Sequence, residues 1–480
     1  MFQSEAVYLA SDSDTRRPII RPMQWTPCHE LDGRSPLSAM AAWPRDVPLS
    51  MLHTNASAQG GRWSVLAVPA GHIEATATSG RWIGPRTPTL EAAASRGAVA
   101  ALEAVDTHRS SGSVTSTTWP FAGWIACLHY ELGAILEPAA GRRTGNETTP
   151  LLTLLWCPDS LLHDRLTGRW WSAGAPPTLA STPLLGEAMT PIGGPISTPT
   201  AADWPDTVAR GVEYIKAGDI FQVNLTRQLR VAVRGDCRAF GHTALGEPQA
   251  AFGAHIEVPH TDRTVISLSP ELFLNVDADG TITSRPIKGT LPSAEPAEQL
   301  RASVKDAAEL HMIVDLMRND LGRVCEVGSV RVPVPRRIET HPTVHHGVGE
   351  ITGVLRGDVS LVDLLAASFP AGSITGAPKI RAMQIAQELE PVGRGMYCGA
   401  VGMLGPGRQA SFSVAIRTAV IEGSFDHAVL RYGVGCGIVA DSDPIDELAE
   451  SETKATVLWE ALSRPCGTPS AAAAYQQSPA

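Results

Sequence analysis

The sequence predicts a strand-rich protein of mixed α and β structure. Its 480 residues are 43% hydrophobic, which is enough to bury a sizeable core. At roughly 150 residues per domain, this length suits about three domains or one large core. The 44 glycines and 37 prolines indicate many tight turns. Short apolar runs alternate with these turns, and longer periodic stretches indicate helices.

The first third of the chain has the pattern of strands around one helix. Strands are expected at 63–69 and 151–156, and one alanine-rich helix at 90–105. From 173 to 200, six prolines stand among Ser, Thr, Gly and Ala, which predicts a linker. These features divide the chain into an N-terminal region, 1–172, and a proline-rich linker, 173–200.

Residues 201–464 form a second region, in which longer helices alternate with strands. Asp203 would cap its first helix, Gly322 would end the second, and Pro378 stands at the first turn of a later one. A closing β-meander and a last helix follow, and the tail 465–480 is expected to be disordered. Helices are expected at 203–218, 298–319, 359–368, 379–389 and 446–462, and strands at 220–229, 265–268, 272–276, 281–284, 399–407, 411–421 and 428–432.

Charge and cysteine usage narrow the class of protein. With 39 Lys and Arg against 49 Asp and Glu, the net charge is −10, which argues against a nucleic-acid partner. The first 17 residues lack an apolar core for a signal peptide, and no uncharged apolar run is long enough for a membrane span. The eight cysteines are scattered without zinc-site spacing, which predicts reduced thiols in a cytoplasmic protein and neither a disulfide framework nor a metal site.

Two helices carry carboxylates in a suggestive arrangement. Glu309 stands among apolar residues of the 298–319 helix, and Glu447, Glu450 and Lys454 share one face of the last helix. Carboxylates from two facing helices are suited to a hard divalent cation such as Mg²⁺. The same spacing is also typical of a solvated, self-paired helix face, so the spacing leaves both interpretations open.

Lys288 stands between Pro286 and Gly289, and the pattern predicts a tight loop after a strand. A lysine that is desolvated there would have a lowered pKa and would act as a nucleophile. An exposed loop lysine fits the same pattern.

Two further features lie late in the chain. Glycines alternate through 432–437, so that a ligand would approach backbone N–H groups, as an anion requires; a close-packed strand has the same composition. Arg417 ends an apolar strand, where it would clamp a carboxylate through two hydrogen bonds or form a structural ion pair.

The chain from about 208 to 461 resembles the chorismate-utilising enzymes. This family includes anthranilate synthase component I, aminodeoxychorismate synthase component I, and the isochorismate and salicylate synthases. The N-terminal region resembles the family at 120–125 and 130–133. Six segments match in order: Asp219–Arg227, Ser269–Phe273, Arg285–Thr290, Met312–Arg323, Phe369–Lys379 and Gly437–Ser442. The resemblance implies an α+β fold, in which two packed antiparallel sheets are flanked by helices in an α/β/β/α sandwich.

Two positions sort the members of this family. Lys288 resembles the lysine of aminodeoxychorismate synthases, whereas anthranilate synthases have alanine there. Members that use water carry a lysine where this chain has Gln222, so the resemblance implies ammonia as the nucleophile. It therefore implies amination of chorismate at C4 to 4-amino-4-deoxychorismate, an aminotransferase-type reaction on the route to p-aminobenzoate and folate.

The resemblance also assigns roles to individual residues. It implies Mg²⁺ as the cofactor, with Glu309, Glu447 and Glu450 as its ligands, and Lys288 and Glu271 as the catalytic nucleophile and acid/base. The chain has no glutaminase motif of its own, so the partners implied are chorismate, ammonia and a separate glutamine amidotransferase subunit, forming a heterodimer. The substrate-binding residues implied are Arg417, Gly435, Gly437, His346, Thr375, Gln222 and Lys454.

Departures from the family pattern leave alternatives open. Gly347-Val-Gly349 replaces the usual Leu-Val-Ser, and Ser451 replaces a threonine. The tryptophan-binding element of feedback-regulated members corresponds to Leu52–Ala56, which lacks the acidic residue, so we predict no tryptophan feedback there. The alternative within the family is anthranilate synthase component I, and the alternative outside catalysis is a scaffold that only binds the glutaminase.

Overall fold

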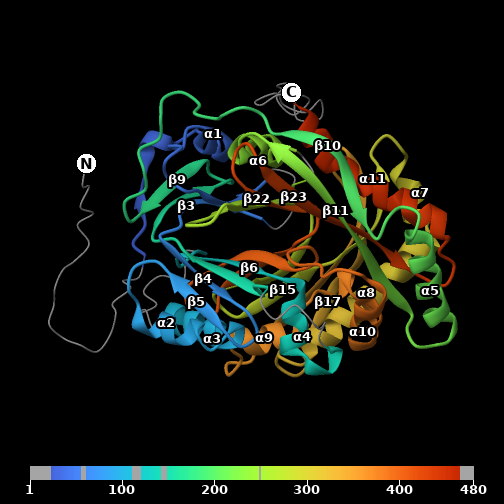
Figure 1. The fold of residues 1–480 in the computed structure, drawn as a ribbon. Coiled ribbons are helices and arrows are strands. Elements are labelled where there is room, and N and C mark those ends of the chain that lie inside the picture. The colour runs from blue at the N-terminus through green and yellow to red at the C-terminus, as the bar shows by residue number, and fades with distance from the viewer. Residues whose placement is uncertain (1–22, 56–60, 111–119, 142–148, 248–249, 465–480) are drawn as a thin grey trace.

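The protein is built from two antiparallel β-sheets packed face to face, with helices on both outer faces (Figure 1). The computed structural model describes residues 23–55, 61–110, 120–141, 149–247 and 250–464. The predicted α/β/β/α sandwich is therefore confirmed. Within the described residues, no helix is long and apolar enough to span a membrane.

The first sheet contains twelve described strands, and each of its pairs is antiparallel. Its longest strand pairing joins β11 and β23, and several of the predicted site residues lie on these two strands. The order from edge to edge is β1 (Thr26–Pro27), β9 (Arg169–Ala173), β8 (Asp159–Asp164), β3 (Trp63–Val68), β2 (Ser50–Thr54), β12 (Phe252–Val258), β13 (Arg263–Ser269), β22 (Thr418–Gly423), β23 (Ala428–Ile438), β11 (Gln222–Arg234) and β10 (Thr190–Thr198), with β19 (Gly376–Ala377) paired to β11.

The second sheet contains eleven described strands. Both sheets take strands from the chain before and after the predicted linker, because strands distant in sequence pair side by side. The order is β16 (Ile287–Pro292), β18 (Val344–Val354), β15 (Thr281–Arg285), β14 (Leu272–Val276), β21 (Ala410–Val414), β20 (Ala400–Leu404), β6 (Trp124–Leu128), β7 (Leu152–Trp156), β4 (Gly71–Ala75) and β5 (Gly80–Ile83), with β17 (Arg331–Thr340) paired to β18.

Apolar side chains fill three layers. Residues such as Val65, Ile125 and Val401 pack between the two sheets, while helices bury the outer faces. α1 (Pro36–Ala41), α6 (Cys237–Leu245) and α11 (Pro444–Ser463) cover the first sheet, and α3 (Ala98–Ser110), α8 (Val304–Gly322) and α9 (Leu361–Ser368) cover the second. The other helices are α2 (Pro88–Ala94), α4 (Gly133–Leu136), α5 (Trp204–Lys216), α7 (Ala297–Ala302) and α10 (Lys379–Leu389).

Several predicted elements change in the structure. The expected 90–105 helix is two helices, because Gly97 turns the chain with a φ of +98°. The expected 298–319 helix breaks at Ser303, whose side chain accepts a hydrogen bond from the Asp306 amide and caps α8. Within the predicted linker, Thr190–Thr198 form β10, because an edge strand tolerates prolines.

The expected closing meander is divided between the two sheets. β20 and β21 lie in the second sheet, and β22 and β23 lie in the first. The chain crosses between them at residues 415–417, where Arg417 has a left-handed φ of +51°. Apolar alternation alone carries no signal for such a crossing, because both sheets bury strands of the same pattern.

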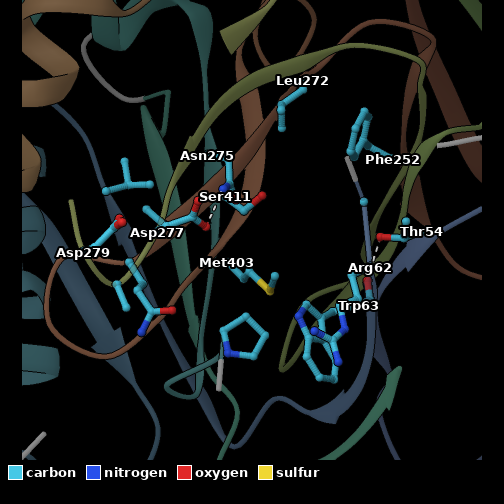
Figure 2. Close-up of a pocket in the computed structure, with 16 residues that line it drawn as sticks. Thr54, Arg62, Trp63, Phe252, Leu272, Asn275, Asp277, Asp279, Met403 and Ser411 are labelled. Atoms are coloured by element: carbon cyan, nitrogen blue, oxygen red, sulfur yellow. Dashed lines mark hydrogen bonds between the residues drawn. The ribbon is translucent and has the colours of Figure 1, made fainter. Parts of the chain in front are cut away.

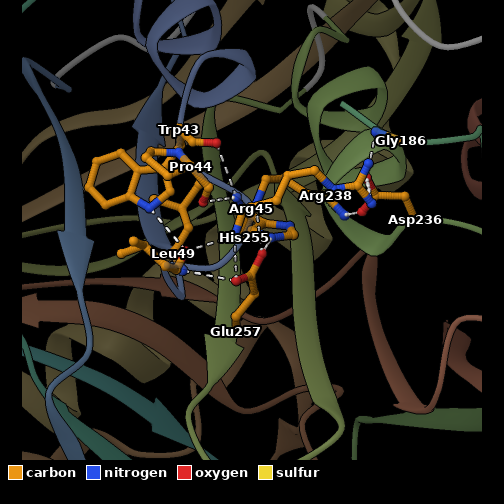
Figure 3. A network of polar contacts seen from close by, with 10 residues as sticks. Trp43, Pro44, Arg45, Leu49, Gly186, Asp236, Arg238, His255 and Glu257 are labelled. Atoms are coloured by element: carbon orange, nitrogen blue, oxygen red, sulfur yellow. Dashed lines mark hydrogen bonds and ion pairs between the residues drawn. The ribbon is translucent and has the colours of Figure 1, made fainter. Parts of the chain in front are cut away.

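A polar network attaches the N-terminal segment to the first sheet (Figure 3). Arg238 on α6 donates to both carboxylate oxygens of Glu257 on β12, at 2.9 and 2.8 Å. It also donates to the carbonyl of Pro44 at 2.8 Å, and Glu257 accepts from the Leu49 amide at 2.9 Å. This buried network joins the chain between α1 and β2 to elements that come two hundred residues later.

Candidate active site

The pairing of β11 with β23 and with β19 brings distant site residues together. On one side, Asn224 lies opposite Gly437 of β23 and Thr226 lies opposite Gly435. On the other side, Gln222 lies opposite Ala377 of β19, so the loop that carries Thr375 is adjacent. Gln222, the two glycines and this loop therefore line one end of the first sheet.

Lys288 lies on strand β16, not on the tight loop that the sequence predicts. The register of β16 against β18 shifts between Ile287 and Thr290, and Gly289 has a φ of +81°, so the strand is locally distorted. The Lys288 Nζ atom lies 3.0 Å from the place that a Cβ on Gly437 would occupy, and the Gln222 side-chain nitrogen lies closer still. Because residue 437 is a glycine, the Lys288 and Gln222 nitrogen atoms can both approach the backbone where a side chain would clash with them.

Glu271 is the most enclosed carboxylate of the site. It lies between β13 and β14 and is 3% exposed. Burial raises the pKa of Glu271 to about 7, against the opposing effects of the Ser373 hydroxyl, the Lys288 charge and the Ile287 backbone amide. A carboxyl with that pKa gives and takes a proton near neutral pH, as a general acid/base requires.

Arg417 and His346 lie close enough for the charge of one to act on the other. His346 on β18 pairs with Thr290 of β16, and its Nδ1 atom lies 2.9 Å from the Thr290 hydroxyl. Burial, followed by the positive charge of Arg417, lowers the pKa of His346 to about 3. The imidazole is therefore neutral at ordinary pH, and Arg417 is the charged member of the two.

Thr375 is placed by its own loop. It is 1% exposed, and its hydroxyl donates to the Ala371 carbonyl at 3.2 Å. Its carbonyl accepts from the Asn224 amide at 2.8 Å. Thr375 thus holds the loop against β11, and its hydroxyl is already engaged.

The last helix presents two carboxylates and a lysine to the site. On α11, Glu447 is 6% exposed and its Oε1 atom accepts from the Ser442 hydroxyl at 2.7 Å. Glu450 pairs with Lys454 at 2.6 Å. Partial desolvation opposes ionisation of Glu450, whose side chain is half exposed, but Lys454 outweighs this effect and lowers the pKa of Glu450. The Lys454 amine also donates to the Gly435 carbonyl at 2.9 Å, which ties α11 to β23.

The structure adds a cysteine that its spacing in the sequence did not indicate. Cys436, Glu447 and Glu450 each offer one ligand atom, and the three atoms lie within 4.8 Å of one another. Glu309 on α8 lies outside this group. Burial raises the pKa of Glu309, and the charges of Lys288 and Glu450 both act on it, so Glu309 lies within electrostatic range of the cluster although it belongs to a different helix.

Comparison with known proteins identifies the family of this chain. Residues 53–460 match the family model described as chorismate binding enzyme. The chain belongs to this family. It is 44% identical over 249 residues to an aminodeoxychorismate synthase component 1 from Klebsiella aerogenes, covering 50% of this chain and 53% of that protein. It is 41% identical over 274 residues to an anthranilate synthase component 1 from Streptomyces coelicolor, covering 55% and 52%.

These matches span about half the length of the curated relatives. Among solved structures, anthranilate synthase component I from Streptococcus pneumoniae superposes with a TM-score of 0.70 at 24% identity, covering 89% of this chain and 98% of that one. The superposition shows the fold. The sequence matches divide between two activities, so the site itself has to distinguish them.

Two buried ion pairs of this chorismate binding enzyme were missed from the sequence. Arg394 pairs with Glu390 and donates to the carbonyls of Ile374 and Asn224, at 3.0 and 2.6 Å. It therefore fastens the loop that carries Thr375 to β11. The other pair joins Lys379 to Asp320 at 2.6 Å. Each of these residues lies in one of the six segments that match the family, and this was the one feature of the sequence that could have indicated the pair.

A second pocket, of about 480 Å³, is lined by other residues (Figure 2). Thr54, Trp63, Phe252 and Met403 line it, and none of the predicted site residues does. Thr54 belongs to Leu52–Ala56, of which Ala56 lies outside the described residues. The absence of tryptophan feedback there stays a prediction.

Proposed function

We propose that this enzyme is the synthase component of an aminodeoxychorismate synthase, which replaces the C4 hydroxyl of chorismate with the amino group of ammonia. The observation that carries the proposal is the position of Lys288. Its amine lies beside Gly437 and Gln222, and its charge acts on Glu271, Glu309 and Glu450. A lysine inside the site is unnecessary for direct attack by ammonia at C2, but it is the nucleophile that a double displacement requires.

The first displacement would use Lys288 and Glu271 together. Glu271 takes a proton from the lysine ammonium, and the free amine forms a bond to C2 of chorismate. The ring double bonds shift and the C4–O bond breaks. Glu271 then returns its proton to the departing hydroxide, which leaves as water.

The second displacement restores the enzyme. Ammonia forms a bond to C4, the ring double bonds shift back, and the bond between C2 and the lysine nitrogen breaks. The net reaction converts chorismate and ammonia into 4-amino-4-deoxychorismate and water. Gln222 is a neutral amide and accepts no proton at ordinary pH, so it would orient ammonia without activating water.

Arg417 and the carboxylates would fix the two acidic ends of chorismate. Arg417, with the backbone amides of Gly435 and Gly437, suits the enolpyruvyl carboxylate. Glu309, Glu447 and Glu450 would hold Mg²⁺, because oxygen donors suit a hard cation and the buried Glu447 Oε2 atom has no hydrogen-bond partner among the described residues. The bound cation would neutralise and anchor the ring carboxylate.

A separate glutaminase subunit would supply the ammonia. The relative from Klebsiella aerogenes is named component 1, which supports a second component for this chain as well. The isolated chain should then work with ammonium salts alone.

The decisive test is a product assay. The purified chain is incubated with chorismate, Mg²⁺ and ammonium, and the products are identified by mass spectrometry, with aminodeoxychorismate lyase in a parallel tube. We expect aminodeoxychorismate, which the lyase converts to p-aminobenzoate. Anthranilate with pyruvate would instead establish the alternative activity that the Streptomyces coelicolor relative supports.

The role of Lys288 has a matched control. Lys288→Ala should abolish C4 amination. The control is Lys305→Ala, which should retain it: the Lys305 charge also acts on Glu309 and Glu450, but this lysine is exposed on α8. Intact protein mass spectrometry with chorismate and no ammonia should show the lysine adduct only when Lys288 is present. Equal aminodeoxychorismate output from both variants would contradict the covalent role.

A further inference from the structure

Cys436 places a sulfur donor beside the carboxylates of α11. It lies on β23 between the two site glycines and is fully buried. Its thiol donates to the Glu447 backbone carbonyl at 3.3 Å. Its Sγ atom and one carboxylate oxygen each of Glu447 and Glu450 lie within 4.8 Å of one another. The arrangement therefore combines one soft and two hard ligand atoms from β23 and α11.

The second observation is an oxygen without a hydrogen-bond partner. Glu447 is 6% exposed, and its Oε1 atom accepts from Ser442. Its Oε2 atom accepts from no group within the described residues. The neighbouring Lys454 is engaged by Glu450 and by the Gly435 carbonyl. A buried carboxylate oxygen that lacks a donor is costly, and a cation at the cluster would remove that cost.

We propose that Cys436, Glu447 and Glu450 bind a thiophilic divalent cation of the Zn²⁺ class. Zn²⁺ accepts thiolate sulfur at about 2.3 Å and carboxylate oxygen at about 2.0–2.2 Å, and three protein ligands leave its fourth position open. On binding, the metal–sulfur bond forms and the thiol proton passes to solvent. Lys454 would give up Glu450 as the cation takes its place.

Such a cation would compete with the proposed Mg²⁺, since both would use Glu447 and Glu450. Mg²⁺ uses oxygen ligands, whereas thiolate sulfur selects softer metals. The thiophilic site itself does not depend on the reaction that the enzyme performs. Only the competition rests on the proposed function.

The test uses Cd²⁺ as a spectroscopic substitute for Zn²⁺. The full chain, freed of metals and without chorismate, is titrated with Cd²⁺, and the sulfur-to-cadmium charge-transfer band is followed in the ultraviolet. We expect a band that saturates at one equivalent. Cys436→Ala should lose it, whereas Cys127→Ala, which removes an equally buried thiol on β6, should retain it. Glu447→Gln should keep the thiol but weaken Cd²⁺ binding by about tenfold or more.

Two results would overturn the proposal: no band in the unaltered chain, or a band of equal affinity in Cys436→Ala. If circular dichroism shows that Cys436→Ala is unfolded, Cys436→Ser keeps the side-chain size and carries the same expectation. Excess Mg²⁺ should raise the apparent Kd for Cd²⁺. Cd²⁺ binding that ignores Mg²⁺ would overturn the shared position, while the product assay judges the proposed function separately.

Discussion

Two ion pairs with the same spacing have opposite surroundings. Glu390 and Arg394 are four residues apart and 2.7 Å from each other, with side chains 4% and 1% exposed. Glu450 and Lys454 are also four residues apart, at 2.6 Å, but are 53% and 44% exposed. The two pairs therefore share their spacing and differ little in distance, and solvent access separates them.

The difference in exposure indicates that the two pairs have different roles, one structural and one open to exchange. The buried pair has further fixed partners, since Arg394 holds the loop at Ile374 and its guanidinium lies 4.2 Å from the Tyr130 ring centre. An exposed pair is weak, because water competes for both charges. Glu450 would therefore exchange Lys454 for the proposed cation, whereas the Arg394 pair keeps the loop at Ile374 in place.

The largest expected effect comes from breaking the buried pair. Arg394→Ala leaves the Glu390 charge buried without its cation, so the free energy of unfolding should fall by about 3–5 kcal/mol. Lys454→Ala breaks the exposed pair and should cost at most about 1 kcal/mol. Urea unfolding of both variants measures the contrast. Similar losses in the two would show that burial does not separate the pairs.

Glu271 extends the comparison of buried and exposed charges, because it is a buried carboxyl without a salt-bridge partner among the described residues. The pH dependence of stability tests the effect of its burial. Folding raises the pKa of Glu271 from 4.5 to about 7, so the folded chain binds this proton more tightly than the unfolded chain. Its contribution to stability is complete below about pH 4.5 and is lost as pH rises through about 7. Relative to the unaltered chain, Glu271→Gln should therefore gain about 3 kcal/mol between pH 4.5 and pH 8.

Urea unfolding of this variant at several pH values measures that gain. Glu271→Gln should also slow C4 amination by about 10²–10⁴-fold, since a general acid is removed. A stability difference that does not vary with pH would contradict the raised pKa of Glu271. An unchanged rate would remove it from the proton transfers.

A smaller effect, on Mg²⁺ binding, should come from the carboxylate of the exposed pair. Glu450→Gln should weaken Mg²⁺ binding by about tenfold, or about 1.4 kcal/mol. Glu452→Gln is the control, since this exposed carboxylate on the same helix lies outside the ligand cluster. Mg²⁺ titration of both variants, by calorimetry and by rate, gives the comparison. Equal Mg²⁺ affinity in the two would remove Glu450 from the proposed cation site.

Much of the fold follows from local pattern. The helices α5 and α10 and the strands β3, β7 and β14 occur where periodicity and turn residues predict them. Breaks at Gly97 and Ser303 escaped prediction, because a positive φ and a cap depend on the path of the chain around them. The division of β20–β23 between two sheets was not predicted either, because the strands that each of them pairs with lie far away in the sequence.

The sequence by itself determined which chemical groups are present and in what order: Lys288, Glu271, Arg417, the paired glycines and the carboxylates of two helices. Tertiary structure alone decided their states. Burial made Glu271 a group that titrates near neutrality and His346 a neutral ring, and strand pairing set Cys436 against Glu447. Charge, solvation and contact depend on neighbours far away in the chain, and linear order carries no record of those neighbours.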